Sequence, residues 1–272
     1  MKLATLQRPR STDHLEAGGP ADPQPPAAVK RRITGWRVWA VRLVLMIAAP
    51  VALLAVLEGG LRLFGYGRPT GFFVSAGSPG KLTCNEEFVW RFSPRETASE
   101  PSPFSISAAK PQRTVRIFVL GGSAAWGTPD PSFNFGRILE VMLRRRYPDV
   151  RFEVVNAAIM GVNSHVVLPI IRDCARRDPD LFIVYLGNNE VIGMFGPGPE
   201  SGNAAPASLS MIRAGLWAKS TRLGQLVGSL LSKEDREDGE ATVQDEAFFL
   251  AHRVAADDPR RTTVCDNFRG NL

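Results

Sequence analysis

The chain has 272 residues, which is long enough for one domain of ordinary size with additional segments, and its formal net charge is +6. Residues 1–70 hold ten Lys or Arg against four Asp or Glu, while residues 71–272 hold 23 of each, so the basic excess does not indicate a nucleic-acid partner for the folded part. The three cysteines and three histidines lack the spacing of a disulfide framework or a metal site, and we expect no cofactor.

The N-terminal region predicts a disordered tail followed by a membrane anchor. Residues 1–35 are mostly Pro, Ala, Gly and polar residues before the basic cluster Lys30-Arg31-Arg32. An apolar run over residues 38–57 then has the length that a helix needs to cross a bilayer, with Trp36 at its start as an interfacial residue. Its one charge, Arg42, can extend toward the headgroups.

We expect residues 36–65 to be an uncleaved transmembrane anchor, because no small-residue cleavage site follows the apolar run. More cations precede the run than follow it, so the positive-inside rule places the N-terminus in the cytoplasm. The expected protein is a single-pass cell-membrane protein with the lipid bilayer as a partner and the rest of the chain outside the cytoplasm. Residues 66–112, rich in Gly, Pro and Ser, are interpreted as a connecting segment that packs against the following domain.

From residue 113 the patterns of strand and helix alternate. Apolar, β-branched stretches predict strands at residues 115–120, 152–156 and 181–186. Amphipathic stretches predict helices at residues 132–147 and 164–177. This alternation predicts an α/β fold, a flavodoxin-like parallel sheet with helices on both faces. Further helices are expected at residues 209–231, at residues 244–256 and from residue 260, and three strands make the sheet incomplete.

The three predicted strands end in loops of small and amide residues, reading Gly121-Gly-Ser-Ala-Ala-Trp-Gly127, Asn156-Ala-Ala-Ile-Met-Gly161 and Gly187-Asn-Asn-Glu190. The carboxyl ends of parallel strands share one edge of the sheet, where open α/β sheets bind ligands. Gly121 and Gly122 would let the backbone turn and leave the Ser123 hydroxyl at that edge as a candidate nucleophile. A small residue in a tight turn is the structural alternative.

These loops resemble the blocks of the SGNH hydrolase family, also called GDSL-type esterases and lipases, over residues 113–272. The first block, G-D-S-x-x-x-G, is matched by Gly121, Gly122, Ser123 and Gly127. The second block supplies Gly161, and the third, G-x-N-D, is matched by Gly187, Asn189 and Glu190. The resemblance implies that Ser123 is the nucleophile and that its N–H, the Gly161 N–H and the Asn189 side chain form an oxyanion hole, with the other matched residues supporting the loops.

Elementary chemistry agrees with these roles. Acyl transfer places negative charge on a carbonyl oxygen, and one fixed donor in a dry site contributes on the order of 3 kcal/mol to its stabilisation. Glycine lets a backbone N–H approach closely, and an asparagine amide is a neutral donor. The alternatives are that Gly161 is only a turn former and that Asn189 is only a loop cap.

The chain departs from the family in three places. Gly122 and Glu190 each replace an aspartate, and the D-x-x-H block that supplies the general base is absent from the sequence. His165, four residues past Gly161, is a candidate substitute base. The last residues resemble an unfinished helix, so we expect a longer protein that carries the missing block, with a helical-repeat region as some similar proteins have. This stretch by itself is expected to hydrolyse esters poorly.

Three functions remain open from the sequence. The first is an extracytoplasmic serine esterase that acts on acyl esters, acetyl esters of carbohydrates among them. The second is an O-acyltransferase that passes the acyl group to a polysaccharide hydroxyl. The third is a non-catalytic, membrane-tethered binding module. Nucleotide binding is disfavoured because the first loop lacks G-x-G-x-x-G.

Overall fold

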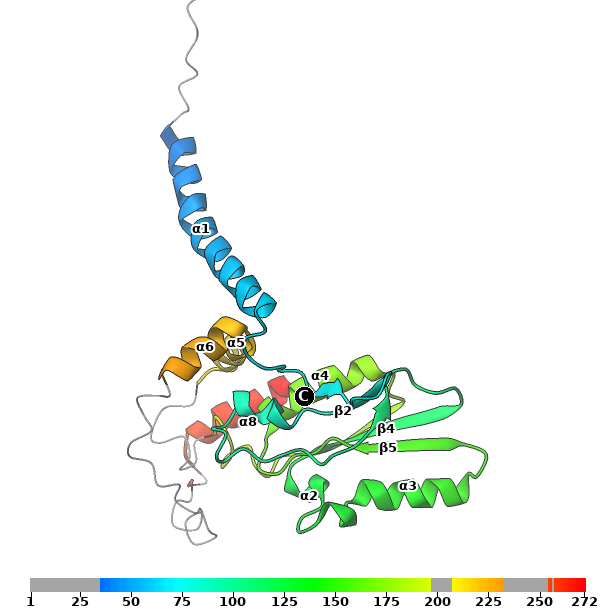
Figure 1. Ribbon diagram of the computed structural model, residues 1–272. Coiled ribbons are helices and arrows are strands. Elements are labelled where there is room, and N and C mark those ends of the chain that lie inside the picture. Colours follow the sequence, from blue (N-terminus) through cyan, green and yellow to red (C-terminus); the bar gives the residue numbers. More distant parts are fainter. Residues whose placement is uncertain (1–34, 197–206, 232–253, 256) are drawn as a thin grey trace, which may run out of the picture. The chain divides into compact units, whose positions relative to one another are not determined.

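The computed structural model describes residues 35–196, 207–231, 254–255 and 257–272 (Figure 1). The chain divides into two units, Met1–Pro50 and Val51–Leu272. Apart from a few end residues, the tail predicted over residues 1–35 and the helix predicted over residues 244–256 lie outside the described part.

The first element is a long apolar helix. Helix α1 runs over Gly35–Leu63, 29 residues, and its most apolar stretch has a mean hydropathy of 2.5 and no buried residue. Within the described residues it is the one helix long and apolar enough to cross a membrane.

The segment over residues 66–112 forms a small antiparallel sheet in the order β1-β2-β3, which the sequence analysis did not predict. Its strands are β1 (Phe73–Ser75), β2 (Lys81–Cys84) and β3 (Ile106–Ser107), and the 3₁₀ helix η1 (Glu86–Arg91) follows β2. The segment packs on the main sheet through aromatic rings, because Phe73 contacts Phe118 edge-on with ring centroids 6.2 Å apart.

The main sheet is parallel and has the order β5-β4-β6. Its strands are β4 (Thr114–Gly121), β5 (Arg151–Asn156) and β6 (Leu181–Tyr185). All three lie within one or two residues of the predicted bounds. In this register Val119 pairs with Asn156 and Gly121 pairs with Tyr185, so the three strand ends come together at one edge.

Helices cover both faces of this sheet, which confirms the predicted α/β class (Figure 1). Helix α3 (Phe135–Arg146) packs closely on one face, where a Cβ on Gly136 would lie 2.9 Å from a methyl group of Val119. Helix α4 (Ser164–Cys174) packs on the other, in the main core with Phe118 and Leu120. Both of these side chains are fully buried, and such burial contributes about 2 kcal/mol each.

Local polar side chains set the ends of these helices. Asn134 caps α3 by accepting a hydrogen bond from Arg137 N at 2.8 Å, so α3 starts after the short 3₁₀ helix η2 (Pro131–Phe133) rather than at residue 132. Asn163 caps α4 by accepting a hydrogen bond from His165 N at 3.2 Å. The helix ends at Cys174 and continues as the 3₁₀ helix η3 (Ala175–Arg177).

The single helix predicted over residues 209–231 is wrong, because two helices occupy it. These are α5 (Leu209–Ser220) and α6 (Arg222–Leu231), separated by Thr221 in an extended conformation. The Thr221 hydroxyl donates to the carbonyl of Ala218 at 2.7 Å and accepts from the Gly224 N–H at 2.9 Å. It therefore ends one helix and caps the next. The final helix, α8 (Arg260–Asn271), begins where the sequence predicts and contacts α4.

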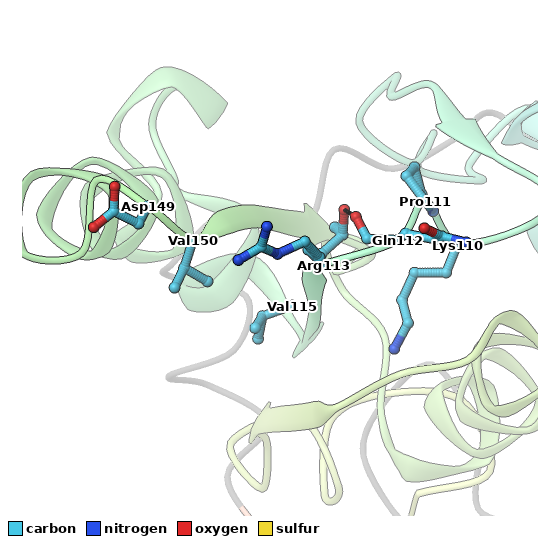
Figure 2. A pocket seen from close by; sticks show the side chains of 8 residues that line it. Lys110, Pro111, Gln112, Arg113, Val115, Asp149 and Val150 are labelled. Atoms are coloured by element: carbon cyan, nitrogen blue, oxygen red, sulfur yellow. Dashed lines mark hydrogen bonds between the residues drawn. The ribbon is translucent and has the colours of Figure 1, made fainter.

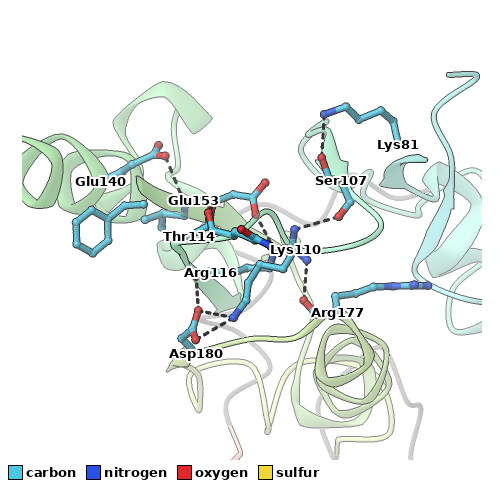
Figure 3. A network of polar contacts seen from close by, with 12 residues as sticks. Lys81, Ser107, Lys110, Thr114, Arg116, Glu140, Glu153, Arg177 and Asp180 are labelled. Carbon is cyan, nitrogen blue, oxygen red and sulfur yellow. Dashed lines mark hydrogen bonds and ion pairs between the residues drawn. The ribbon is translucent and has the colours of Figure 1, made fainter. Parts of the chain in front are cut away.

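One fully buried arginine ties the amino ends of the strands together (Figure 3). Arg116 in β4 pairs with Glu153 of β5 at 2.6 Å between Nε and Oε2. Its Nη1 donates to the carbonyl of Arg177 at 2.7 Å and its Nη2 to that of Ser107 at 3.0 Å. The charge is thus hydrogen-bonded at all three nitrogens, as burial of a guanidinium requires.

Candidate active site

The first strand-end loop holds Ser123 at the carboxyl end of β4. Ser123 opens the one-turn helix α2 (Ser123–Trp126) and is half-buried. Among the described residues its hydroxyl has no hydrogen-bond partner, while its carbonyl accepts from Gly127 N and Thr128 N. The preceding turn requires glycine, since a Cβ on Gly121 would lie 2.1 Å from the carbonyl oxygen of Tyr185. Ser123 thus follows a tight glycine turn, and in the described part of the chain its hydroxyl is not engaged in a hydrogen bond.

Gly127 closes this first loop. It adopts a left-handed φ of 109° at the end of α2, and a Cβ there would lie 2.9 Å from the backbone nitrogen of Asn134. A larger residue would therefore push α2 away from the start of α3.

The second loop runs beside the first. Its Ala157 N donates to Val119 O at 2.8 Å and its Ile159 N to Gly121 O at 3.1 Å, which extends the β4–β5 pairing past the strand ends. Gly161 is exposed with a left-handed φ of 70°, and an added Cβ would meet no atom within 4 Å. Its requirement for glycine is therefore conformational.

Asn156 joins the second loop to the first, a role that sequence reasoning missed. Its Nδ2 donates to the carbonyls of Ala125 and Trp126, each at 3.2 Å, and its Oδ1 accepts from Ala158 N at 3.1 Å. These carbonyls lie at the end of α2 and lack partners within that helix. The asparagine at the end of β5 therefore holds the Ser123 helix in place.

The third loop brings Asn189 against the first. Asn189 is buried, and its Nδ2 donates to the carbonyl of Val162 at 2.9 Å. The same nitrogen lies 2.8 Å from the position that a Cβ on Gly122 would occupy. Gly122, the neighbour of Ser123, thus leaves room for this amide. An amide nitrogen carries two N–H donors, so one remains beyond the bond to Val162.

Gly187 and Glu190 shape this third loop. Gly187 has a left-handed φ of 128°, and an added Cβ would meet no atom within 4 Å. Glu190 is buried and accepts two hydrogen bonds from Ser164, at 2.8 Å from its backbone N–H and 2.8 Å from its hydroxyl. Burial raises the pKa of Glu190, and the bonds from Ser164 oppose that shift. The carboxylate therefore fastens the third loop to the amino end of α4.

The structure gives His165 surroundings that do not include Ser123. Its Nδ1 lies 3.1 Å from Asn271 Nδ2, and its ring meets Phe195 edge-on at 5.4 Å. Burial, with a contribution from the charge of Arg213, lowers the pKa of His165 to about 4. Within the described residues it makes no hydrogen bond with Ser123, and the other two histidines, His14 and His252, lie outside that part.

A cleft of about 490 Å³ lies elsewhere, at the amino end of β4 (Figure 2). Residues 110–115 and Asp149-Val150 line it, with Arg113 and Lys110 among the labelled side chains. None of its lining residues belongs to the three strand-end loops, so this cleft is separate from the candidate site.

The fold and these loops define an α/β protein with a serine, a glycine turn and an asparagine amide at the carboxyl edge of its parallel sheet. No protein-family profile matches the chain, and no curated protein matches it. Among solved structures, the chain is similar to AlinE4, an SGNH-hydrolase family esterase, with 22% identity and a TM-score of 0.26 over 41% of this chain and 53% of that one. An aspartate-to-alanine mutant of AlinE4 matches with the same values.

The chain is also similar to TesA, with 17% identity and a TM-score of 0.27 over 58% of this chain and 99% of TesA. The match to AlinE4 spans about half of the length of that protein. AlinE4 belongs to the family that the loop motifs resemble.

Proposed function

We propose that the chain is part of a membrane-anchored serine esterase of the SGNH type, with Ser123 as its nucleophile. One observation carries this proposal: the Asn189 amide lies against Gly122, directly beside a serine whose hydroxyl has no partner in the described part of the chain. A purely structural serine in a tight turn has no need of a buried amide next to it.

The proposed reaction is acyl transfer through a covalent intermediate. Ser123 Oγ attacks the carbonyl carbon of an ester, its proton passes to a base, and the carbonyl oxygen becomes an oxyanion. The ester C–O bond then breaks, the alcohol leaves with a proton, and water releases the acid from the acyl-enzyme. The resemblance assigns the base to a histidine of the D-x-x-H block, which this sequence does not contain.

The oxyanion would be stabilised by three neutral donors from three loops: the N–H groups of Ser123 and Gly161 and the second N–H of Asn189. Asn156 joins the first two loops, and Glu190 with Ser164 holds the third, which supports donors that are in position before substrate arrives. Preorganised donors of this kind are worth more than flexible ones because they need no rearrangement during the reaction.

We further propose that α1 anchors the protein, with its N-terminus in the cytoplasm and the site outside. Support comes from the length and hydropathy of α1 and from the basic residues that precede it. The proposed substrates are acyl esters, including acetyl esters of carbohydrates. An acyltransferase would use the same donors and differ only in taking a sugar hydroxyl in place of water.

Hydrolysis of nitrophenyl acetate by the natural protein at its full length tests the proposal. Ser123→Ala should lower kcat/KM by several orders of magnitude, because the nucleophile is lost. Ser78→Ala is the matched control, since Ser78 is exposed and lies outside the three strand-end loops, and this change should leave turnover unchanged. Undiminished turnover in Ser123→Ala would place the nucleophile elsewhere, and an inactive wild type would favour the binding module.

A further inference from the structure

Helix α6 is amphipathic, with its polar side toward the protein and its apolar side away from it. The Gln225 side chain makes two hydrogen bonds with the backbone of Arg68. Its Oε1 accepts from the Arg68 N–H at 2.9 Å, and its Nε2 donates to the Arg68 carbonyl at 3.2 Å. The Ser229 hydroxyl lies 3.2 Å from that of Tyr66. A surface helix of a water-soluble domain usually has the opposite arrangement, with its apolar stripe on the core.

The apolar stripe of α6 has large exposed side chains. Four residues fall on the face away from Gln225 and Ser229 at helical spacing: Leu223, Val227, Leu230 and Leu231. The exposed fractions are 52% for Val227, 60% for Leu230 and 61% for Leu231. Nothing in the described part of the chain covers these three.

The start of α6 is fixed to the end of α1 (Figure 1). The Glu58 carboxylate accepts the N–H of Arg222 at 3.0 Å and that of Leu223 at 2.9 Å, and so caps α6. Glu58 is also the first residue after the apolar run over residues 38–57. Helix α6 therefore begins at the level along α1 where the apolar run gives way to polar residues.

Neighbouring residues also have the character of a membrane interface. Leu63 and Phe64, at the end of α1, are 88% and 90% exposed, and Trp217 of α5 is largely exposed as well. Large apolar and aromatic side chains collect where a chain meets the headgroup region. The residues that follow α6 in the sequence, 233–240, are charged at seven of their eight positions.

We infer that α6 lies in the membrane–water interface, with its apolar stripe against the acyl chains of the bilayer; this rests on the proposed membrane anchoring by α1. Ten residues of helix are about 15 Å long, too short to cross a hydrocarbon core of about 30 Å. A one-sided helix of this kind lies in the interface plane instead. Helix α5 continues from α6 into the domain, where Ile212 is buried and Leu216 packs on the main core. The α/β domain is thereby held to the membrane at a second point.

Spin labelling tests this inference in the full chain, reconstituted in vesicles of equal parts phosphatidylcholine and phosphatidylglycerol. Cys265, the exposed cysteine among the three, is first changed to Ser. Single labels are then placed at Leu230 on the apolar stripe, at Gly228 on the other side of α6, and at Leu53 in α1. Gly228 is a matched control because an added Cβ would meet no atom within 4 Å. Collision rates with oxygen and with a water-soluble nickel complex report the depth of each label.

The inference predicts an oxygen-to-nickel ratio several-fold higher at Leu230 than at Gly228, with Leu53 deeper still. A Leu230 label as open to nickel as the Gly228 label would overturn it. So would a Leu230 label shielded from both reagents, because protein would then cover the stripe, either residues 232–253 or a second copy. A Leu53 label in water would instead show that the anchoring itself fails, so the two failures are distinguishable.

Discussion

At the scale of single residues, the close approach of the Asn189 amide to the first loop depends on glycine at position 122. Position 122 holds glycine where the G-D-S-x-x-x-G block has aspartate. A Cβ at this position would lie only 2.8 Å from the Asn189 amide nitrogen. The buried Asn189 amide donates one N–H to the carbonyl of Val162, and this hydrogen bond fixes the orientation of the amide and leaves its second N–H available. Glycine at position 122 therefore leaves space for the Asn189 amide beside Ser123.

Removing the asparagine amide should leave the nucleophile but weaken the oxyanion hole. In the full-length protein, Asn189→Ala is expected to lower kcat roughly a hundred- to a thousand-fold, the usual cost of one oxyanion donor. The neighbouring exposed Asn188→Ala serves as the control and should have little effect. Steady-state kinetics measure both, and unchanged turnover in Asn189→Ala would make this residue a loop cap only.

Introducing an aspartate at position 122 should also lower activity. In Gly122→Asp the new Cβ would lie 2.8 Å from the Asn189 nitrogen, so the amide must move, and the carboxylate adds negative charge beside a developing oxyanion. We expect a fall in kcat with substrate KM less affected. Activity equal to that of the wild type would show that the amide does not need its observed position.

At the scale of elements, a buried polar network joins α4, α8 and the third loop. Asn271 of α8 donates to the Ser164 hydroxyl at 3.0 Å and lies 3.1 Å from the His165 ring nitrogen, while Ser164 holds Glu190. The groups around the His165 ring are thus Asn271, Phe195 and the charge of Arg213. Burial keeps the histidine neutral, and a neutral ring can accept from Asn271.

This network predicts a pH dependence of stability. His165 has an ordinary pKa of 6.5 and a folded pKa of about 4, so between these values the unfolded chain binds the proton more readily. The free energy of unfolding should therefore fall as pH is lowered from about 6.5 to about 4. Burial raises the pKa of Glu190, so this group acts in the opposite direction. Its contribution to stability is lost as pH rises above the pKa that Glu190 has in the unfolded chain.

The pH dependence of stability is compared between the wild type and His165→Gln. Both proteins retain Glu190, so the difference between them reports on His165. The melting temperature of the detergent-solubilised chain should drop less between pH 7 and pH 4.5 in the variant. His14→Gln, a change in the N-terminal tail, is the control and should behave as the wild type does. An equal drop in all three proteins would assign the pH dependence to other groups.

At the scale of the whole molecule, local patterns predicted the parts that depend on local chemistry. The three strands of the main sheet and the positions of Ser123 and Asn189 at one edge follow from apolar runs, glycine turns and the geometry of parallel strands. The seat of Asn189 on Gly122 and the role of Asn156 could not be predicted, because they depend on the exact register of the loops.

Longer-range and competing signals account for the rest. The β1–β3 sheet has strands of only two to four residues, too short for a period to show. Arg116 stands in an apolar strand, and its burial depends on partners as distant in sequence as Glu153 and Arg177. The break at Thr221 was hidden because the apolar pattern continues through it.

Covalent trapping of Ser123 tests the central claim most directly. The full-length protein is treated with a fluorophosphonate probe, whose phosphonyl oxygen imitates the oxyanion, and the labelled peptide is identified by mass spectrometry. We predict a single adduct on Ser123 that is absent in Ser123→Ala and retained in Ser78→Ala. An adduct on another residue, or no adduct on the intact wild type, would contradict the assignment of Ser123 as the nucleophile of an acyl-transfer site.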